Sequence, residues 1–243
     1  MKRMLTGWLT AIALVLFSTV AAAQEPLKLG RDYTLIDPPA PSENPAKIEV
    51  NMYFSFACPH CFELNQRLVA WTKKLPADVD FKHVPVSFNP FYQLMARFYY
   101  TLEALGELPR LESAVFDALH VKGLRLVSEK SIGEWMATQG VEAKKFQETF
   151  NSFGVATKVR RADQLAQAVR LSGVPTLVVD GRYQVLGQDY SATQARTDKI
   201  IDMRRAERAN DKLTPPTLMK DKSPAAPAKA AKKPASTEQQ AQK

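Results

Sequence analysis

Cys58 and Cys61, the only two cysteines among the 243 residues, enclose Pro59 and His60. Two thiols at this spacing at the start of a helix can alternate between a dithiol and a disulfide. The two enclosed residues help to set how strongly the disulfide accepts electrons, so we expect Pro59 and His60 to tune the redox potential. The motif therefore predicts thiol–disulfide exchange with Cys58 and Cys61 as the catalytic pair.

A structural disulfide or a metal site would also use paired cysteines. A Cys58–Cys61 bond closes a loop with two intervening residues and adds little stability through chain entropy. Zinc usually needs four ligands, and the chain offers only His60, His83 and His120 besides the cysteines. Both alternatives are therefore disfavoured, and we expect neither a metal nor a cofactor. His83 and His120 are predicted to be packed histidines without a role.

The segments beside the motif have the patterns of a strand and a helix. Residues 47–56 are apolar and aromatic with alternation, which predicts a buried strand that leads into the motif. Apolar residues then recur at helical spacing, namely Phe62, Leu64, Leu68, Trp71 and Leu75. A strand, the two cysteines and a helix in this order are typical of a redox-active pair.

Further along the chain, the patterns predict more strands and several helices. Ser131 and Glu134 are expected to form a capping box within the helical region. The turn at Asp180-Gly181 predicts a hairpin. The segments concerned are a strand at 79–86, helices across 91–170, hairpin strands at 174–179 and 182–186, and a last helix at 193–209.

This order of elements predicts an α/β fold in which a helical block interrupts one mixed sheet. The lead-in at 24–46 is rich in proline and is expected to be extended along the surface. Residues 47–90 and 155–209 are the two parts of the sheet domain, and 91–154 are the helical insertion. Residues 210–243 are rich in Ala, Lys and Pro, which predicts a disordered tail.

The first 23 residues have the features of a cleaved signal peptide. Lys2 and Arg3 precede an apolar run from Trp8 to Val20, and Ala21-Ala22-Ala23 supplies small residues for cleavage. An uncleaved membrane anchor is the alternative, but the run is short for a span of about 20 residues. We therefore expect export to an oxidising compartment, which is the periplasm in a Gram-negative cell.

The formal net charge of +8 is concentrated at the two ends of the chain. The signal segment carries +2 and residues 213–243 carry +4, which leaves +2 for the body between them. Nucleic-acid binding needs a focused basic face, and the nearly neutral body does not supply one. We therefore expect no nucleic-acid partner.

Two segments resemble a known family. Residues 54–61, Phe-Ser-Phe-Ala-Cys-Pro-His-Cys, and residues 173–183, Gly-Val-Pro-Thr-Leu-Val-Val-Asp-Gly-Arg-Tyr, look like the signature segments of DsbA-type thiol:disulfide interchange proteins of the thioredoxin superfamily. The resemblance covers residues 27–209. It implies a thioredoxin fold with an inserted helical domain, and it implies an oxidase that forms disulfides in exported proteins.

The resemblance also implies roles for individual residues. Cys58 would be the exposed attacking thiol and Cys61 the buried resolving thiol. Val174 and Pro175 would form a cis-proline loop that faces the disulfide and binds the substrate backbone. The implied partners are unfolded exported proteins with free thiols and a quinone-linked membrane protein of the DsbB type, with the chain itself as a monomer.

One position departs from the family. Well-known members carry a buried acid six positions before the first cysteine, where this chain has Met52. Glu49 is no simple replacement, because an odd offset along a strand places it on the opposite face. Those members also have a lysine on the next strand, near Lys82 and His83 here. The resemblance therefore gives no support for a buried acid–lysine pair beside the cysteines.

Two other functions remain open from the sequence. A protein of the same fold could act as a disulfide isomerase or a reductant kept in the dithiol state. A secreted binding or chaperone module could carry the thiols incidentally, and its function would then survive replacement of Cys58. The sequence names no substrate and gives no redox potential.

Overall fold

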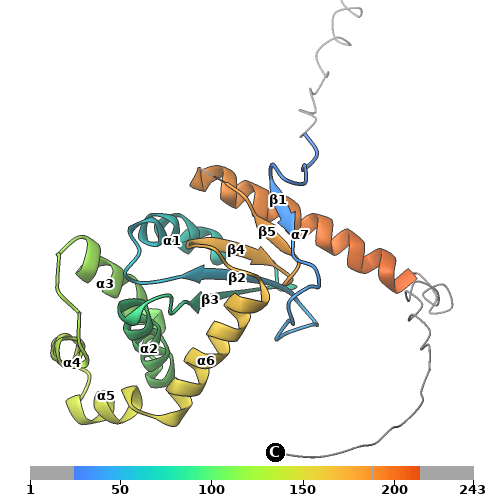
Figure 1. Cartoon of the computed structure of the whole chain (residues 1–243). Coiled ribbons are helices and arrows are strands. Elements are labelled where there is room, and N and C mark those ends of the chain that lie inside the picture. The colour runs from blue at the N-terminus through green and yellow to red at the C-terminus, as the bar shows by residue number, and fades with distance from the viewer. Residues whose placement is uncertain (1–24, 188, 214–243) are drawn as a thin grey trace, which may run out of the picture. The chain divides into compact units, whose positions relative to one another are not determined.

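The computed structural model describes residues 25–187 and 189–213 (Figure 1). Their strands form one mixed five-stranded sheet in the order β1-β5-β4-β2-β3. The inner strand β2 pairs with β3 in parallel and with β4 antiparallel, and the remaining pairs are antiparallel. The strands are β1 (Tyr33–Leu35), β2 (Ile48–Phe54), β3 (Val79–Pro85), β4 (Thr176–Val179) and β5 (Tyr183–Val185).

Helices separate the strands along the chain, although the strands are neighbours in the sheet. Helix α1 connects β2 to β3, five helices lie between β3 and β4 in the chain, and α7 follows β5. Figure 1 shows α3, α4 and α5 to one side of the sheet, whereas α6 returns along it. The bounds are α1 (Pro59–Thr72), α2 (Pro90–Leu105), α3 (Leu108–His120), α4 (Glu129–Thr138), α5 (Ala143–Phe150), α6 (Phe153–Ala168) and α7 (Tyr190–Leu213).

The alternation of β2 assigns its side chains to two hydrophobic clusters, one on each face of the sheet. Met52 and Phe54 pack in a cluster that includes residues of α1 and α7. Tyr53 packs in a second cluster with residues of α6, such as Leu165. All seven residues of β2 are buried, as a strand between two helical layers requires. This architecture confirms the α/β prediction of a thioredoxin fold with a helical insertion.

The predicted lead-in is only partly correct. Residues Tyr33–Leu35 form an edge strand, whereas an extended surface segment was expected throughout 24–46. The reason is pairing with β5, in which Tyr33 lies opposite Val185. The Tyr33 ring also packs edge-on against Tyr183, with centroids 5.6 Å apart. A strand of three residues has too few positions for alternation to be recognised.

Two other local predictions need correction. The capping box lies at Ser128 and Ser131, not at Ser131 and Glu134, because Ser128 is the N-cap and Ser131 is the third helical residue. Helix α7 continues to Leu213, so residues 210–213 are not part of a disordered tail. The predicted signal peptide and residues 214–243 lie outside the described residues. No helix in the described part of the chain is long and apolar enough to cross a bilayer.

Candidate active site

The turn after β2 places Cys58 at the N-cap of α1. The Cys58 N–H donates to the Ser55 carbonyl over 3.1 Å, and Cys58 has the extended backbone of an N-cap residue. Pro59 follows at the first helical position, where its missing N–H removes no helical hydrogen bond. The strand, the turn and the proline together place the Cys58 sulfur at the N-terminal end of α1.

The Cys58 sulfur contacts both the helix and a distant loop. It accepts a hydrogen bond from the Cys61 N–H over 3.3 Å and lies 3.7 Å from the Val174 carbonyl oxygen. Cys58 is 5% exposed and Cys61 is fully buried. The expected exposed position of Cys58 is therefore wrong, because the loop at Val174 covers much of it. Cys58 is nevertheless the more accessible of the two thiols.

The local environment sets the pKa values of the two thiols apart. The pKa of Cys58 falls to about 6, first because the Cys61 thiol donates to it, and also through the backbone N–H groups of Cys61 and His60 and the charge of His60. Burial of Cys58 opposes this decrease. The pKa of Cys61 rises because it is buried and lies against the Cys58 thiolate. Cys58 is the nucleophile that this geometry selects.

These pKa values determine what the site can do at neutral pH. With a pKa of about 6, Cys58 is about nine-tenths thiolate at pH 7. Relative to an ordinary thiol, this stabilises the reduced form by about 1.4 kcal/mol at pH 7, or about 30 mV for the two-electron couple. The disulfide has no charge for the helix to stabilise. The site therefore favours its own reduction and the oxidation of a partner.

His60 lies at the open side of the site. Its side chain is 72% exposed, and its Nδ1 lies 3.9 Å from Glu63 Oε2. Its charge is the smallest of the contributions that lower the pKa of Cys58. Pro59 acts on the backbone of the first turn, where it occupies the first helical position. The structure thus places both residues beside the Cys58 thiol, where they were expected.

Val174 and Pro175 lie where the resemblance implies. Their peptide bond is cis, both residues are half-buried, and the Val174 carbonyl oxygen lies beside Cys58 Sγ. Strand β4 starts directly after them at Thr176, which pairs with Tyr53 of β2. Pairing between two central strands therefore brings the loop to the cysteines across 116 positions of sequence.

Two tyrosines near the cysteines were not recognised from the sequence. The pKa of Tyr92 is raised by burial and then by the negative charges of Cys58 and Cys61. The pKa of Tyr190 is raised by burial and by Glu63, with smaller contributions from the cysteines. Tyr92 falls within residues 91–170, for which the sequence predicts only helices. No local signal distinguishes such a residue from a core residue.

An acid–lysine pair is present, but it lies away from the cysteine side of β2. Met52 is fully buried in the cluster that contains α1. Glu49 is on the opposite face, as the alternation predicts, and its Oε2 lies 3.4 Å from Lys82 Nζ. Asn51 Nδ2 donates to the other oxygen of Glu49 over 2.7 Å, and the Glu43 N–H donates to Oε2 over 3.1 Å.

We expect Lys82→Met to destabilise the protein without changing its redox potential. The Glu49 side chain is 1% exposed, and in the variant its carboxylate would lose the Lys82 ammonium as a partner. Because a buried charge is then less well compensated, we expect the free energy of unfolding to fall by about 2 kcal/mol. Chemical denaturation measures this, with Lys130→Met as the matched control, since the Lys130–Glu134 pair is at the surface. A shift in the glutathione equilibrium of the Lys82→Met variant would contradict the separation of the pair from the cysteines.

His83 and His120 both make specific contacts. His83 Nδ1 lies 2.8 Å from Glu112 Oε1, which connects β3 to α3. His120 Nε2 donates to the Phe56 carbonyl over 2.7 Å, and its ring stacks on Phe62 with centroids 5.2 Å apart. His120 therefore connects the C-terminal end of α3 to Phe56, before the cysteines, and to Phe62, after them. Among the described residues, no three His, Cys, Asp or Glu side chains gather to hold a metal ion.

Comparison with known proteins identifies the family to which the chain belongs. The model of the DSBA-like thioredoxin domain matches residues 49–196, which include the cysteines, the helical insertion and the Val174–Pro175 loop. The chain belongs to the DsbA family. The thiol:disulfide interchange protein DsbA of Bordetella parapertussis is 40% identical over 197 residues, covering 79% of this chain and 94% of that protein. DsbA of Azotobacter vinelandii is 35% identical over 187 residues, covering 76% and 87%.

Solved structures of DsbA proteins have the same fold. The oxidoreductase DsbA of Xylella fastidiosa superposes with a TM-score of 0.72 at 34% identity, covering 75% of this chain and all of that chain. DsbA of Pseudomonas aeruginosa gives a TM-score of 0.70 at 34% identity, with coverage of 76% and 97%. The similarity of this DsbA family member to these structures spans both the sheet and the helical insertion.

Proposed function

We propose that this protein is a thiol:disulfide oxidoreductase that donates the Cys58–Cys61 disulfide to exported proteins. Its relatives are named thiol:disulfide interchange proteins. The observation that carries the proposal is the placement of Cys58 at the N-cap of α1, with a pKa of about 6, above a buried Cys61. A low thiolate pKa makes the disulfide the stronger oxidant, which is the property a disulfide donor needs.

The reaction begins with the oxidised protein. A substrate thiolate attacks Cys58 Sγ, forms a mixed disulfide and breaks the Cys58–Cys61 bond. Cys61 leaves with the electron pair and takes up a proton, since its pKa is raised by burial. A second substrate thiolate then attacks the substrate sulfur of the mixed disulfide, and Cys58 leaves as its stabilised thiolate. The substrate loses two electrons and gains a disulfide, and the protein ends as the dithiol.

Other residues support these steps in this proposal. Pro59 and His60 tune the potential through the first turn of α1. Val174 and Pro175 bind the substrate backbone, because they are half-buried and lie against Cys58. Residues 47–90 and 155–209 carry the redox site, and residues 91–154 form the helical insertion that packs beside it.

The cellular setting is part of the proposal. The predicted signal peptide at 1–23 and the need for an oxidising compartment favour the periplasm. Each turnover leaves the dithiol, so an oxidant must restore the disulfide, and a quinone-linked membrane partner of the DsbB type fits that need. We propose that the protein acts as a monomer on unfolded proteins with free thiols.

Catalytic oxidation of a reduced, unfolded protein tests this function. We expect oxidised protein to convert a reduced model substrate with two cysteines to its disulfide form faster than glutathione disulfide at equal concentration. Acid quenching and mass spectrometry measure both products. Reduction of the substrate disulfide by this protein in a glutathione buffer would favour the reductant alternative. Substrate oxidation at the rate of glutathione disulfide alone would contradict the proposal.

A further inference from the structure

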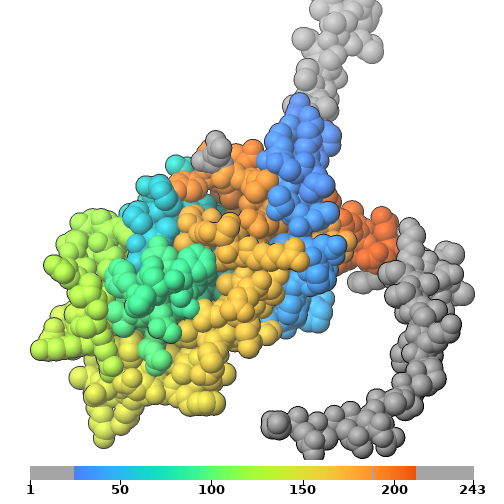
Figure 2. Space-filling view, in the orientation of Figure 1, coloured from blue at the N-terminus to red at the C-terminus, as the bar shows by residue number. Residues whose placement is uncertain are grey.

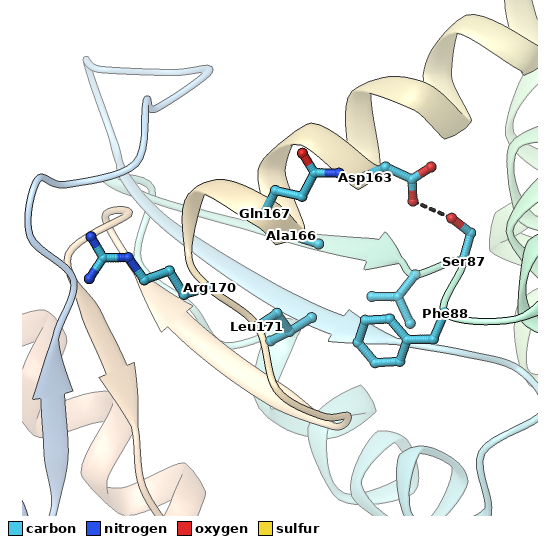
Figure 3. A pocket seen from close by; sticks show the side chains of 8 residues that line it. Ser87, Phe88, Asp163, Ala166, Gln167, Arg170 and Leu171 are labelled. Atoms are coloured by element: carbon cyan, nitrogen blue, oxygen red, sulfur yellow. Dashed lines mark hydrogen bonds between the residues drawn. The ribbon is translucent and has the colours of Figure 1, made fainter.

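A cavity of about 320 Å³ lies between α6 and the loop that joins β3 to α2 (Figure 3). Asp163 and Gln167 line it from α6, and Ser87 and Phe88 line it from the loop. Leu171 lines it from the segment after α6. Figure 2 shows α6 on the visible face of the molecule.

The cavity is close to the redox site but separate from it. Leu171 is three residues before Val174, whose carbonyl oxygen lies 3.7 Å from Cys58 Sγ. Three residues span at most about 11 Å. On the other side, Phe88 stacks on Tyr92 with centroids 6.3 Å apart, and Tyr92 is close enough to the cysteines for their charges to raise its pKa. The cavity walls are therefore connected to the cysteines through Val174 on one side and Tyr92 on the other.

The lining combines apolar side chains with polar groups, among which Asp163 is the carboxylate and Arg170 the cation. Phe88 is 50% exposed, and Figure 3 shows its ring and Leu171 below α6. Asp163 accepts a hydrogen bond from Ser87 Oγ through Oδ1, and it makes no ion pair in the part of the chain that the structure describes. The Arg170 side chain points away from Asp163 and donates to the Asp37 carbonyl over 3.1 Å. The second oxygen of Asp163 is thus available for a cation.

We propose that this cavity binds a lysine or arginine side chain of the substrate polypeptide, about three residues from the cysteine that reacts. The inference rests on the proposed function. The aliphatic part of such a side chain fits against Phe88 and Leu171, and its charge meets Asp163. An extended substrate bound along Val174 and Pro175 advances about 3.3 Å per residue, so its third residue from the cysteine reaches the cavity. Asp163 is then a specificity-determining residue.

Cysteine peptides that differ at one position test the proposal. Each peptide carries Lys, norleucine or Glu at two, three or four residues on either side of a single cysteine, and stopped-flow measures the rate constant of its reaction with the oxidised protein. We expect the Lys peptide to react about fivefold faster than the norleucine peptide at one of these positions, the size of a partly exposed ion pair. Asp163→Asn should remove this difference and leave the norleucine rate unchanged. Asp163→Lys should favour the Glu peptide.

Two further variants keep the test specific. Ser87→Ala removes the hydrogen bond to Asp163 but keeps the carboxylate, so it should retain the Lys preference. Asp117→Asn makes the same chemical change at an exposed position of α3 and should also retain it. The subsite proposal would be overturned if the preference for the Lys peptide persisted in the Asp163→Asn variant. It would also be overturned if the unchanged protein showed no preference for Lys at any position. If neither the Lys peptide nor the norleucine peptide reacts with the oxidised protein, the proposed function is contradicted, and the subsite proposal that rests on it is contradicted too.

Discussion

Replacing Cys58 with serine is expected to abolish thiol–disulfide exchange, whereas replacing Cys61 with serine is expected to trap the substrate. Cys61 is fully buried and its pKa is raised, so it cannot take over the attack when Cys58 is absent. When Cys58 is present alone, it still forms a mixed disulfide, but the route of release through Cys61 is lost. Incubation with a peptide disulfide and mass spectrometry under acid quench measures the trapped adduct.

The opposite pattern would show that the roles of the two cysteines are exchanged. An adduct on Cys61 in the Cys58→Ser variant would require the helix to expose a residue that is buried in the structure. The control is the far-ultraviolet circular dichroism of both variants, which should match that of the unchanged protein. A Cys→Ser change at either position replaces one sulfur atom with one oxygen atom, so the fold is expected to persist.

The second large effect is a pH-dependent gain in the stability of the reduced form. The folded pKa of Cys58, about 6, lies below that of a thiol in the unfolded chain, about 8.5. The stabilisation is therefore full above about pH 8.5, partial at pH 7, and lost as the pH falls through 6. Between pH 5 and pH 8, we expect the reduced form to gain about 2.5 kcal/mol relative to the oxidised form.

Thermal unfolding of both redox forms at several pH values measures this gain. For a domain of this size it corresponds to about 5–10 °C in Tm, and we expect the reduced form to be the more stable at neutral pH. Above about pH 8.5 the gain should end and the stability of the reduced form should fall, because Cys61, whose pKa is raised by burial, then ionises in the unfolded chain but not in the folded protein. The Cys58→Ser variant is the control and should lack the gain. A difference between redox forms that is independent of pH would contradict the stabilised thiolate.

Local patterns predicted most of the scaffold because the chemistry lies at a strand–helix junction. The alternation of residues 47–56 and the spacing from Phe62 onward placed Cys58 and Cys61 correctly at the start of α1. The same alternation predicted that Glu49 and Met52 lie on opposite faces of β2. These features depend on neighbours within about one turn or one strand, which the sequence displays directly.

Other features depend on pairings across long stretches of chain. The edge strand at Tyr33–Leu35 forms only because β5 is beside it, about 150 residues later. Burial of Cys58 depends on the loop at Val174, and only the three-dimensional arrangement reveals Tyr92 as a neighbour of the cysteines. The cavity at Asp163 likewise joins α6 to a loop that precedes α2. No local pattern encodes such contacts, so the sequence alone could not predict them.

The most direct measurement is the equilibrium between the Cys58–Cys61 pair and a glutathione redox buffer, combined with the pH titration of the Cys58 thiolate by its absorbance at 240 nm. The account predicts a disulfide that glutathione reduces readily and an apparent Cys58 pKa near 6. Such a result would also show that Met52, in place of the family's buried acid, is compatible with a disulfide donor. A disulfide that resists reduction, together with an ordinary thiol pKa near 8.5, would contradict the account and assign the protein to the reductants.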